Sequence, residues 1–290
     1  MTKTVYNINN TYKCGDGLIV KILAENTPIS DDFEIEHGLS LYIEIGSNKL
    51  LFDVGKSDLF IKNAKKLGVD PVKVDFAVIS HGHYDHGGGL DSFFNLNNRV
   101  NVYIHNKAFC DYYSKRDNKI KYIGLNKGLA DNNQIIFTSD YLKIKDNIEL
   151  FSNVRGKKYL PLFNGNLLKK VKDEYTADDF IHEQNIIITE GKKIVLVAGC
   201  AHNGIVNIID KFKEIKKTYP DIVIGGFHLY NHNTGESEDS ESIKRIAAEL
   251  KKTNAMFYTC HCTGLAAYDK LKKELNDKIQ YISTGCVLEI

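Results

Sequence analysis

The sequence has no long hydrophobic run and almost no net charge. No apolar segment approaches the roughly 20 residues of a membrane-spanning helix, and the first ten residues lack the apolar core of a signal peptide. These absences predict a cytoplasmic protein that does not enter a membrane. There are 38 lysines and arginines against 37 acidic residues. This balance argues against a protein that binds nucleic acid through its charge.

Arginine is scarce, whereas cysteine is not. Only four of the 38 basic residues are arginines, so few side chains can make paired hydrogen bonds with phosphate groups. Cysteine occurs six times. In a reducing cytoplasm we expect these cysteines as free thiols or metal ligands rather than as disulfides.

A short segment after the apolar run 76–79 holds the densest group of reactive side chains. The run predicts a buried strand, and the next residues include His81, His83, Asp85 and His86. In an extended chain, residues i and i+2 point to the same side, so His81 and His83 can hold one ion together. Asp85 and His86 follow after the chain begins to turn, and they suit a second ion beside the first.

This ligand set predicts two divalent metal ions. Imidazole and carboxylate without thiolate favour zinc, with iron or manganese as alternatives. Two ions about 3.5–4 Å apart can share a hydroxide and stabilise an oxyanion. A solvated loop with incidental histidines is the alternative, but the density of the motif at a strand end argues against it.

The expected elements form two similar halves, each rich in strands and followed by helices. This order suits a four-layer αββα sandwich, in which two sheets pack face to face between outer helices. The expected strands are 18–25, 39–45, 49–53, 74–80, 100–105, 134–138, 141–144, 148–151, 185–189, 194–198, 221–226, 255–259, 278–283 and 286–290. The expected helices are 57–67, 107–113, 203–217, 237–251 and a last one that ends near 275. Residues 155–180 lack strand alternation and are expected as a long excursion that covers the metal pocket.

An HxHxDH segment after an apolar strand resembles the signature of the metallo-β-lactamase superfamily. Further segments follow in an order that resembles one branch, the dihydropterin ribofuranosylaminobenzene phosphate synthase-like proteins. These segments are LLFDVG at 50–55, GCAHNG at 199–204, GGFHL at 225–229 and CHCTG at 260–264. The resemblance extends over about residues 18–290. It implies a metallo-β-lactamase fold, with the chain 1–290 as one domain.

Two later histidines at strand ends are candidates to complete the metal sites. His202 follows the strand 194–198 and can complete the first site, and His261 follows the strand 255–259 and can complete the second. The predicted ligands are therefore His81, His83 and His202 for one ion, and Asp85, His86 and His261 for the other.

The resemblance implies two further roles near the metals. Asp53 would orient the histidine ligands from behind and fix their tautomers, and His182 is expected in a similar supporting position. Superfamily members usually carry an aspartate that bridges the two ions, but this chain has Cys200 and His202 after the corresponding strand. The bridging ligand therefore stays open, with Asp178, Asp179 and His182 as candidates.

Other residues are expected to act on the substrate. Asp85 could steer the nucleophile, and His228, after a pair of glycines, is assigned to substrate contact or catalysis. The candidate substrate-binding residues are His37, Arg155, Lys157 and Lys158. The three basic residues suit an anionic, phosphorylated small molecule, although a solvated basic loop is an equal alternative. His232, in a polar loop, is expected to be unused.

These observations favour a metal-dependent hydrolase acting on an ester, amide or phosphoester. The branch resemblance adds a pterin-phosphate condensing synthase as an alternative. A third possibility is an iron or iron–sulfur redox protein with the thiolates of Cys200, Cys260, Cys262 and Cys286. Against it, strand alternation would turn Cys260 and Cys262 away from the side that His261 faces. The intact motif also argues against a binding module without catalysis.

Overall fold

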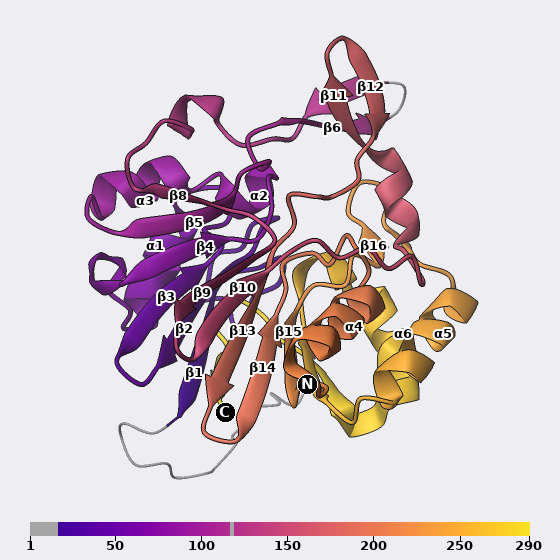
Figure 1. The fold of residues 1–290 in the computed structure, drawn as a ribbon. Helices are drawn as coiled ribbons and strands as arrows, with labels where there is room; N and C mark the ends of the chain where they lie inside the picture. Colours follow the sequence, from indigo (N-terminus) through magenta and orange to yellow (C-terminus); the bar gives the residue numbers. More distant parts are fainter. Residues whose placement is uncertain (1–16, 117–118) are drawn as a thin grey trace.

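The computed structural model describes residues 17–116 and 119–290. Two seven-stranded sheets lie face to face, and helices cover the outer side of each (Figure 1). The predicted four-layer αββα sandwich is therefore confirmed. No helix within the described residues combines the length and the apolar character needed to cross a bilayer. The expectation that no signal peptide is present concerns residues 1–10, which lie outside the described part of the chain.

The first sheet comes from the two ends of the chain and its first half. In spatial order its strands are β20 (Val287–Glu289), β1 (Leu18–Ala24), β2 (Ser40–Ile45), β3 (Asn48–Phe52), β4 (Phe76–Ile79), β5 (Asn101–His105) and β8 (Ile135–Thr138). The helices of this half are α1 (Leu59–Lys66), α2 (Tyr84–Gly87) and α3 (Leu90–Leu96).

The second sheet comes from the second half of the chain. In spatial order its strands are β19 (Ile279–Tyr281), β18 (Met256–Thr259), β15 (Ile222–Gly225), β14 (Lys193–Val197), β13 (Asn185–Glu190), β10 (Ile148–Phe151) and β9 (Tyr141–Lys145). Its outer helices are α4 (Ile205–Lys216), α5 (Ser240–Lys251) and α6 (Leu265–Leu275).

Strand alternation explains the layers. In β3, Leu50 packs in the core between the sheets, whereas its neighbour Leu51 packs against α1 and α3. In β14, Val195 packs between the sheets and Leu196 packs under the outer helices of the second half. Because successive side chains of a strand point to opposite faces, strands covered on both sides are apolar throughout.

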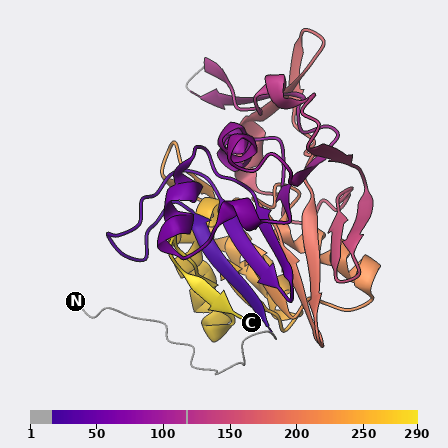
Figure 2. The same ribbon diagram turned by 90° about the vertical axis from the view of Figure 1, so that its left-hand side faces the viewer.

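A smaller four-stranded sheet projects beyond the sandwich, at the top of Figures 1 and 2. Its strands are β12 (Glu174–Ala177), β11 (Leu167–Val171), β6 (Asp111–Arg116) and β7 (Lys119–Tyr122). The helix expected over 107–113 is wrong: β6 begins at Asp111 and pairs with both β7 and β11. The excursion 155–180 likewise contains the hairpin β11–β12. Strand β6 pairs with the distant β11, and a local pattern does not encode such a pairing.

The parallel strands place the reactive side chains together. Strands β3 and β4 run parallel, and so do β14, β15 and β18. In such sheets, the carboxyl ends of the strands meet at one edge, where ligands bind. The residues that follow these five strand ends include Asp53, His81, Cys200, His228 and His261.

Gln184 joins the two sheets directly below this edge. Its side-chain Nε2 donates to the carbonyl oxygens of Ile79 at 2.7 Å and Tyr103 at 3.1 Å, in β4 and β5. Its Oε1 accepts from the Thr138 hydroxyl in β8 at 2.6 Å. Gln184 is fully buried. One side chain therefore satisfies polar groups on three strands of the opposite sheet.

We predict that Gln184→Ala lowers the free energy of unfolding by about 3 kcal/mol, because it leaves buried polar groups without partners. Chemical denaturation of the metal-free protein measures this change. The control is Gln280→Ala in the half-buried β19, where we expect a much smaller effect. Equal unfolding midpoints for the two variants would contradict the prediction.

Candidate metal centre

The metal motif changes from extended to helical backbone at His83. His83 has φ −104° and ψ 145°, and helix α2 begins at the next residue. His81 and His83 therefore lie on extended chain, whereas Asp85 and His86 lie on the first turns of α2. This is the change of direction that the spacing predicts, and it separates the four side chains into two pairs.

The first pair meets His202 from the other half of the chain. The ring centroids of His81 and His83 are 4.6 Å apart, and they lie 4.9 and 5.0 Å from that of His202. All three side chains are buried. None of their Nε2 atoms has a hydrogen-bond partner in the described part of the chain. The structure thus brings together the three residues predicted for the first ion.

The second pair meets His261. One oxygen of Asp85, Oδ2, lies 3.7 Å from His86 Nε2 and 3.5 Å from His261 Nε2. The ring centroids of His86 and His261 are 5.0 Å apart. The three residues predicted for the second ion therefore converge as well, with one atom of each pointing to a common space.

Hydrogen bonds at the Nδ1 atoms of His81 and His86 fix the orientation of these imidazoles. Asp53 Oδ2 lies 2.6 Å from His86 Nδ1 and accepts from the Ser80 hydroxyl at 2.8 Å. Since that hydroxyl donates to Asp53, it accepts from His81 Nδ1 at 2.8 Å. A proton on Nδ1 leaves the Nε2 lone pair free to bind a metal. Asp53 lies where the resemblance places it, behind the ligands.

Two amide side chains hold the histidines of the second half in the same way. The Oδ1 of Asn26 lies 2.7 Å from His261 Nδ1, and that of Asn164 lies 3.1 Å from His202 Nδ1. As acceptors, these oxygens select the same tautomer as Asp53 does. No sequence pattern pointed to either asparagine.

The buried nitrogens fit a divalent metal. The Nε2 atoms of His81, His83, His202 and His261 are buried without a hydrogen-bond partner among the described residues. Native proteins rarely bury polar groups in this state, and zinc binds imidazole nitrogen readily. Burial lowers the pKa of His81 and His202 well below the usual range, so both are neutral, as a ligand must be.

Unlike His81 and His202, His86 favours its protonated form. Although burial opposes it, the carboxylates of Asp53 and Asp85 raise the pKa of His86 to about 9. Without a metal ion, His86 is therefore protonated at neutral pH. An ion that binds its Nε2 must displace this proton, as expected for a metal site.

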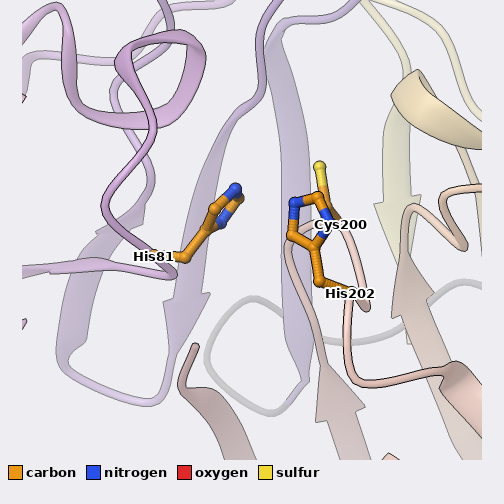
Figure 3. Close-up of side chains that lie close together, drawn as sticks. All are labelled: His81, Cys200 and His202. Atoms are coloured by element: carbon orange, nitrogen blue, oxygen red, sulfur yellow. The ribbon is translucent and has the colours of Figure 1, made fainter. Parts of the chain in front are cut away.

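Cys200 lies where the two ligand groups meet. Its Sγ is 3.1 Å from His86 Nε2. It forms one candidate ligand group with His81 and His202, and a second with His86 and His261. Figure 3 shows the first of these groups, with the rings of His81 and His202 side by side near the sulfur atom. Burial raises the pKa of the Cys200 thiol well above its usual range.

Asp178 and Asp179, the two carboxylates considered as bridging ligands, each contact another side chain. Gly82 N–H donates to His182 Nδ1 at 2.8 Å, so His182 carries its proton on Nε2, which lies 3.1 Å from Asp178 Oδ2. Asp178 is therefore already paired, although its Oδ2 also lies 3.9 Å from His83 Nε2. Asp179 is exposed and pairs with Lys169. His182 and Asp178 form a further candidate ligand group with His83.

The four cysteines of the redox alternative do not come together. Cys260 lies in the core between the sheets, and Cys286 packs against that core. Neither belongs to a candidate ligand group in the described residues. The alternation expected around His261 also fails for Cys262, which lines the pocket. His261 has φ +50° and begins a 3-10 turn, so the strand has already ended there.

A pocket of about 350 Å³ opens over the ligand groups. His37 and His228 line it, and so does His232, contrary to the expectation that it would be unused. The His37 and His232 rings stack at 4.3 Å, and His37 Nε2 lies 3.4 Å from Asp85 Oδ2. Burial lowers the pKa of His37 to about 3, so this imidazole is neutral. The ring centroids of His228 and His202 are 4.2 Å apart.

The structure does not bring Arg155, Lys157 and Lys158 to this pocket. Lys158 forms an ion pair with Asp210 on α4 at 2.9 Å, and Arg155 lines a separate surface groove. The basic residues that do line the pocket are Lys115 and Arg116, at the end of β6. The sequence did not point to these two residues, because they reach the pocket through the pairing of β6 with the distant β11.

Comparisons with known proteins agree with the fold and the motif. A model of the metallo-β-lactamase superfamily matches residues 35–124. The chain is 29% identical to uncharacterized protein MJ0448 of Methanocaldococcus jannaschii, over 94% of this chain and 100% of that protein. It is 26% identical to the 7,8-dihydropterin-6-methyl-4-(β-D-ribofuranosyl)-aminobenzene-5'-phosphate synthase of the same organism, over 94% and 97% of the two chains. The crystal structure of Tm1679, described as a metal-dependent hydrolase of the β-lactamase superfamily, matches with a TM-score of 0.79. Its sequence identity is 32%, over 94% of this chain and 99% of that chain.

We predict that His83→Ala and Asp85→Ala each lower the bound metal by about one ion per chain, because each removes a ligand from a different site. Elemental analysis of the purified variants measures this. His105→Ala is the control, since this buried histidine belongs to no candidate ligand group among the described residues. Wild-type metal content in both ligand variants would show that the assignment is wrong.

Proposed function

Since the chain belongs to the metallo-β-lactamase superfamily, we propose that it is a hydrolase that carries two divalent metal ions, with zinc as the first candidate. The observation that carries this proposal is the convergence of buried imidazole nitrogens that lack hydrogen-bond partners among the described residues. Burying unpaired nitrogens costs free energy in the metal-free protein, whereas the same arrangement is favourable around a bound cation.

Each ion would have its own set of protein ligands. His81, His83 and His202 would hold the first ion, and Asp85, His86 and His261 would hold the second. When bound, the ions would supply Lewis-acid activation of a water molecule and of the bond to be cleaved. Asp53 and the Ser80 hydroxyl would keep His81 and His86 in the binding tautomer.

The residues above the ligands would bind and orient the substrate. His228 lines the pocket, and neither of its ring nitrogens has a hydrogen-bond partner in the described residues. It can therefore exchange a proton or a hydrogen bond with a leaving group. His37, neutral and close to Asp85, is placed to contact the substrate beside the second ion.

A small, anionic, phosphorylated substrate remains our proposal, but with different basic residues. Lys115 and Arg116 line the pocket, and the Arg116 Nε donates to the Ser114 hydroxyl at 3.2 Å, which restrains the guanidinium. Arginine suits phosphate because its planar guanidinium group can donate two parallel hydrogen bonds to the oxygens of the anion. The pocket of about 350 Å³ accommodates a small molecule rather than a polymer.

The second candidate function is a pterin-phosphate condensing synthase. It is favoured by the relative from Methanocaldococcus jannaschii that carries the synthase name and aligns over 94% of this chain. In that reaction the same site would stabilise a phosphate leaving group instead of activating water for hydrolysis. Product analysis with a phosphorylated dihydropterin, in the presence and absence of an amine acceptor, separates the two functions.

We predict that the metal-loaded protein prefers phosphate esters in a screen of phosphomonoesters, phosphodiesters, lactones and thioesters. Arg116→Gln should raise KM for the preferred anion about tenfold or more, because a hydrogen bond to a charged group is lost. The matched control is Arg155→Gln, outside the pocket, where KM should not change. Preference for a neutral lactone, with no effect of Arg116→Gln, would refute the anionic substrate.

A further inference from the structure

We propose that Cys200 is itself a metal ligand and that its thiolate bridges the two ions. The inference rests on the proposed metal centre but goes beyond it, since the sequence suggested a thiolate-free site. It assigns to sulfur the position in which the resembling family usually has an aspartate oxygen.

Cys200 is placed between both ligand groups. Its Sγ, His81 and His202 present ligand atoms that all lie within 4.8 Å of one another, and the same holds for Sγ, His86 and His261. Its Sγ also lies 3.1 Å from His86 Nε2, which joins the second-half cysteine to the motif of the first half. A thiolate has enough lone pairs to bond to two cations.

The surrounding nitrogens point to a ligand independently of the cysteine. His81, His202 and His261 are at most 1% exposed, and the Nε2 atom of each lacks a hydrogen-bond partner among the described residues. These nitrogens and Sγ lie close together at the ends of the strands, as Figure 3 shows for the first group. A bridging anion bonded to ions on both sides accounts for all of these unpaired atoms.

The carboxylates near the centre cannot take the bridging position as they stand. Asp178 is paired with His182, and Asp53 faces the back of the histidines. Asp85 approaches His37, His86 and His261, all on the side of the second ion. Cys200 is therefore the side chain within the described residues that belongs to candidate ligand groups on both sides.

Cys262 lies beside Cys200 and forms a third candidate ligand group with Cys200 and His228. In this arrangement we assign it a positioning role. Its thiol donates to the Cys200 carbonyl oxygen at 3.5 Å, and its Sγ accepts from the His228 backbone N–H at 3.2 Å. Both bonds fix the backbone around the metal site, and serine keeps a donor and an acceptor at this position. A Cβ on Gly226 would lie 2.4 Å from Cys262 Sγ, which explains why glycine is needed beside it.

A sulfur bridge predicts a preference among metals. Thiolate is a softer ligand than carboxylate, so it favours zinc, cobalt or ferrous iron over manganese and magnesium. An oxygen bridge would weaken this preference. Metal selectivity therefore gives a readout that does not depend on catalytic activity.

The test uses cobalt(II) as a spectroscopic probe. Full-length protein is stripped of metal with a chelator, loaded with cobalt(II), and examined by absorption spectroscopy together with elemental analysis. We expect two cobalt ions per chain and a sulfur-to-cobalt charge-transfer band in the near ultraviolet. Cys200→Asp should keep both ions, lose the band, and discriminate less strongly between zinc and manganese in competition. Cys262→Ser should keep the band.

The outcomes separate this inference from the proposed function. Two bound cobalt ions without a charge-transfer band in the wild type would overturn the thiolate bridge and leave the two-metal hydrolase intact. A chain that binds no metal would overturn both. A band that survives in Cys200→Asp but disappears in Cys262→Ser would assign the ligand to Cys262 and overturn the inference. The wild-type spectrum decides the first two outcomes even if a variant fails to fold.

Discussion

The buried carboxylate of Asp53 supports much of the metal centre. It accepts from the Ser80 backbone N–H at 2.6 Å and from the Ser80 hydroxyl at 2.8 Å, and it lies 2.6 Å from His86 Nδ1. Through Ser80 it also orients His81. One side chain at the end of β3 thus sets the tautomers of a candidate ligand in each site. The positive φ of Asp53, +62°, is the local strain that this position requires.

The centre exists only when the two halves of the chain have met. The first half supplies the motif around His81, and the second half supplies Cys200, His202 and His261. Next to the site, the side chain of Gln184 joins the two halves through hydrogen bonds to Thr138 and Ile79. Burying these imidazoles without partners costs free energy, and a bound cation offsets that cost. Metal binding should therefore stabilise the contact between the sheets by mass action.

The sequence alone predicted the parts of this structure that depend on local pattern. Strand alternation gave the layers, and the spacing around His83 predicted the change from extended chain to helix that the structure shows there. Strand ends also located His202 and His261 beside those pairs. In each case the deciding information lay within a few residues, or in the rule that parallel strands end at one edge of a sheet.

The parts that could not be predicted depend on contacts between distant segments. Strand β6 forms because it pairs with β11, so Arg116 reaches the pocket and Arg155 does not. Cys262 faces the site because the backbone turns at His261, which no alternation rule anticipates. The position of Cys200 relative to His86 likewise depends on how the two sheets pack.

Anomalous diffraction from crystals of the metal-loaded protein tests the central claim most directly. Data collected on both sides of the zinc absorption edge should show two peaks about 3.5–4 Å apart. One peak should lie among His81, His83 and His202, and the other among Asp85, His86 and His261. A single peak, or peaks outside these two groups, would contradict the account of a two-metal centre.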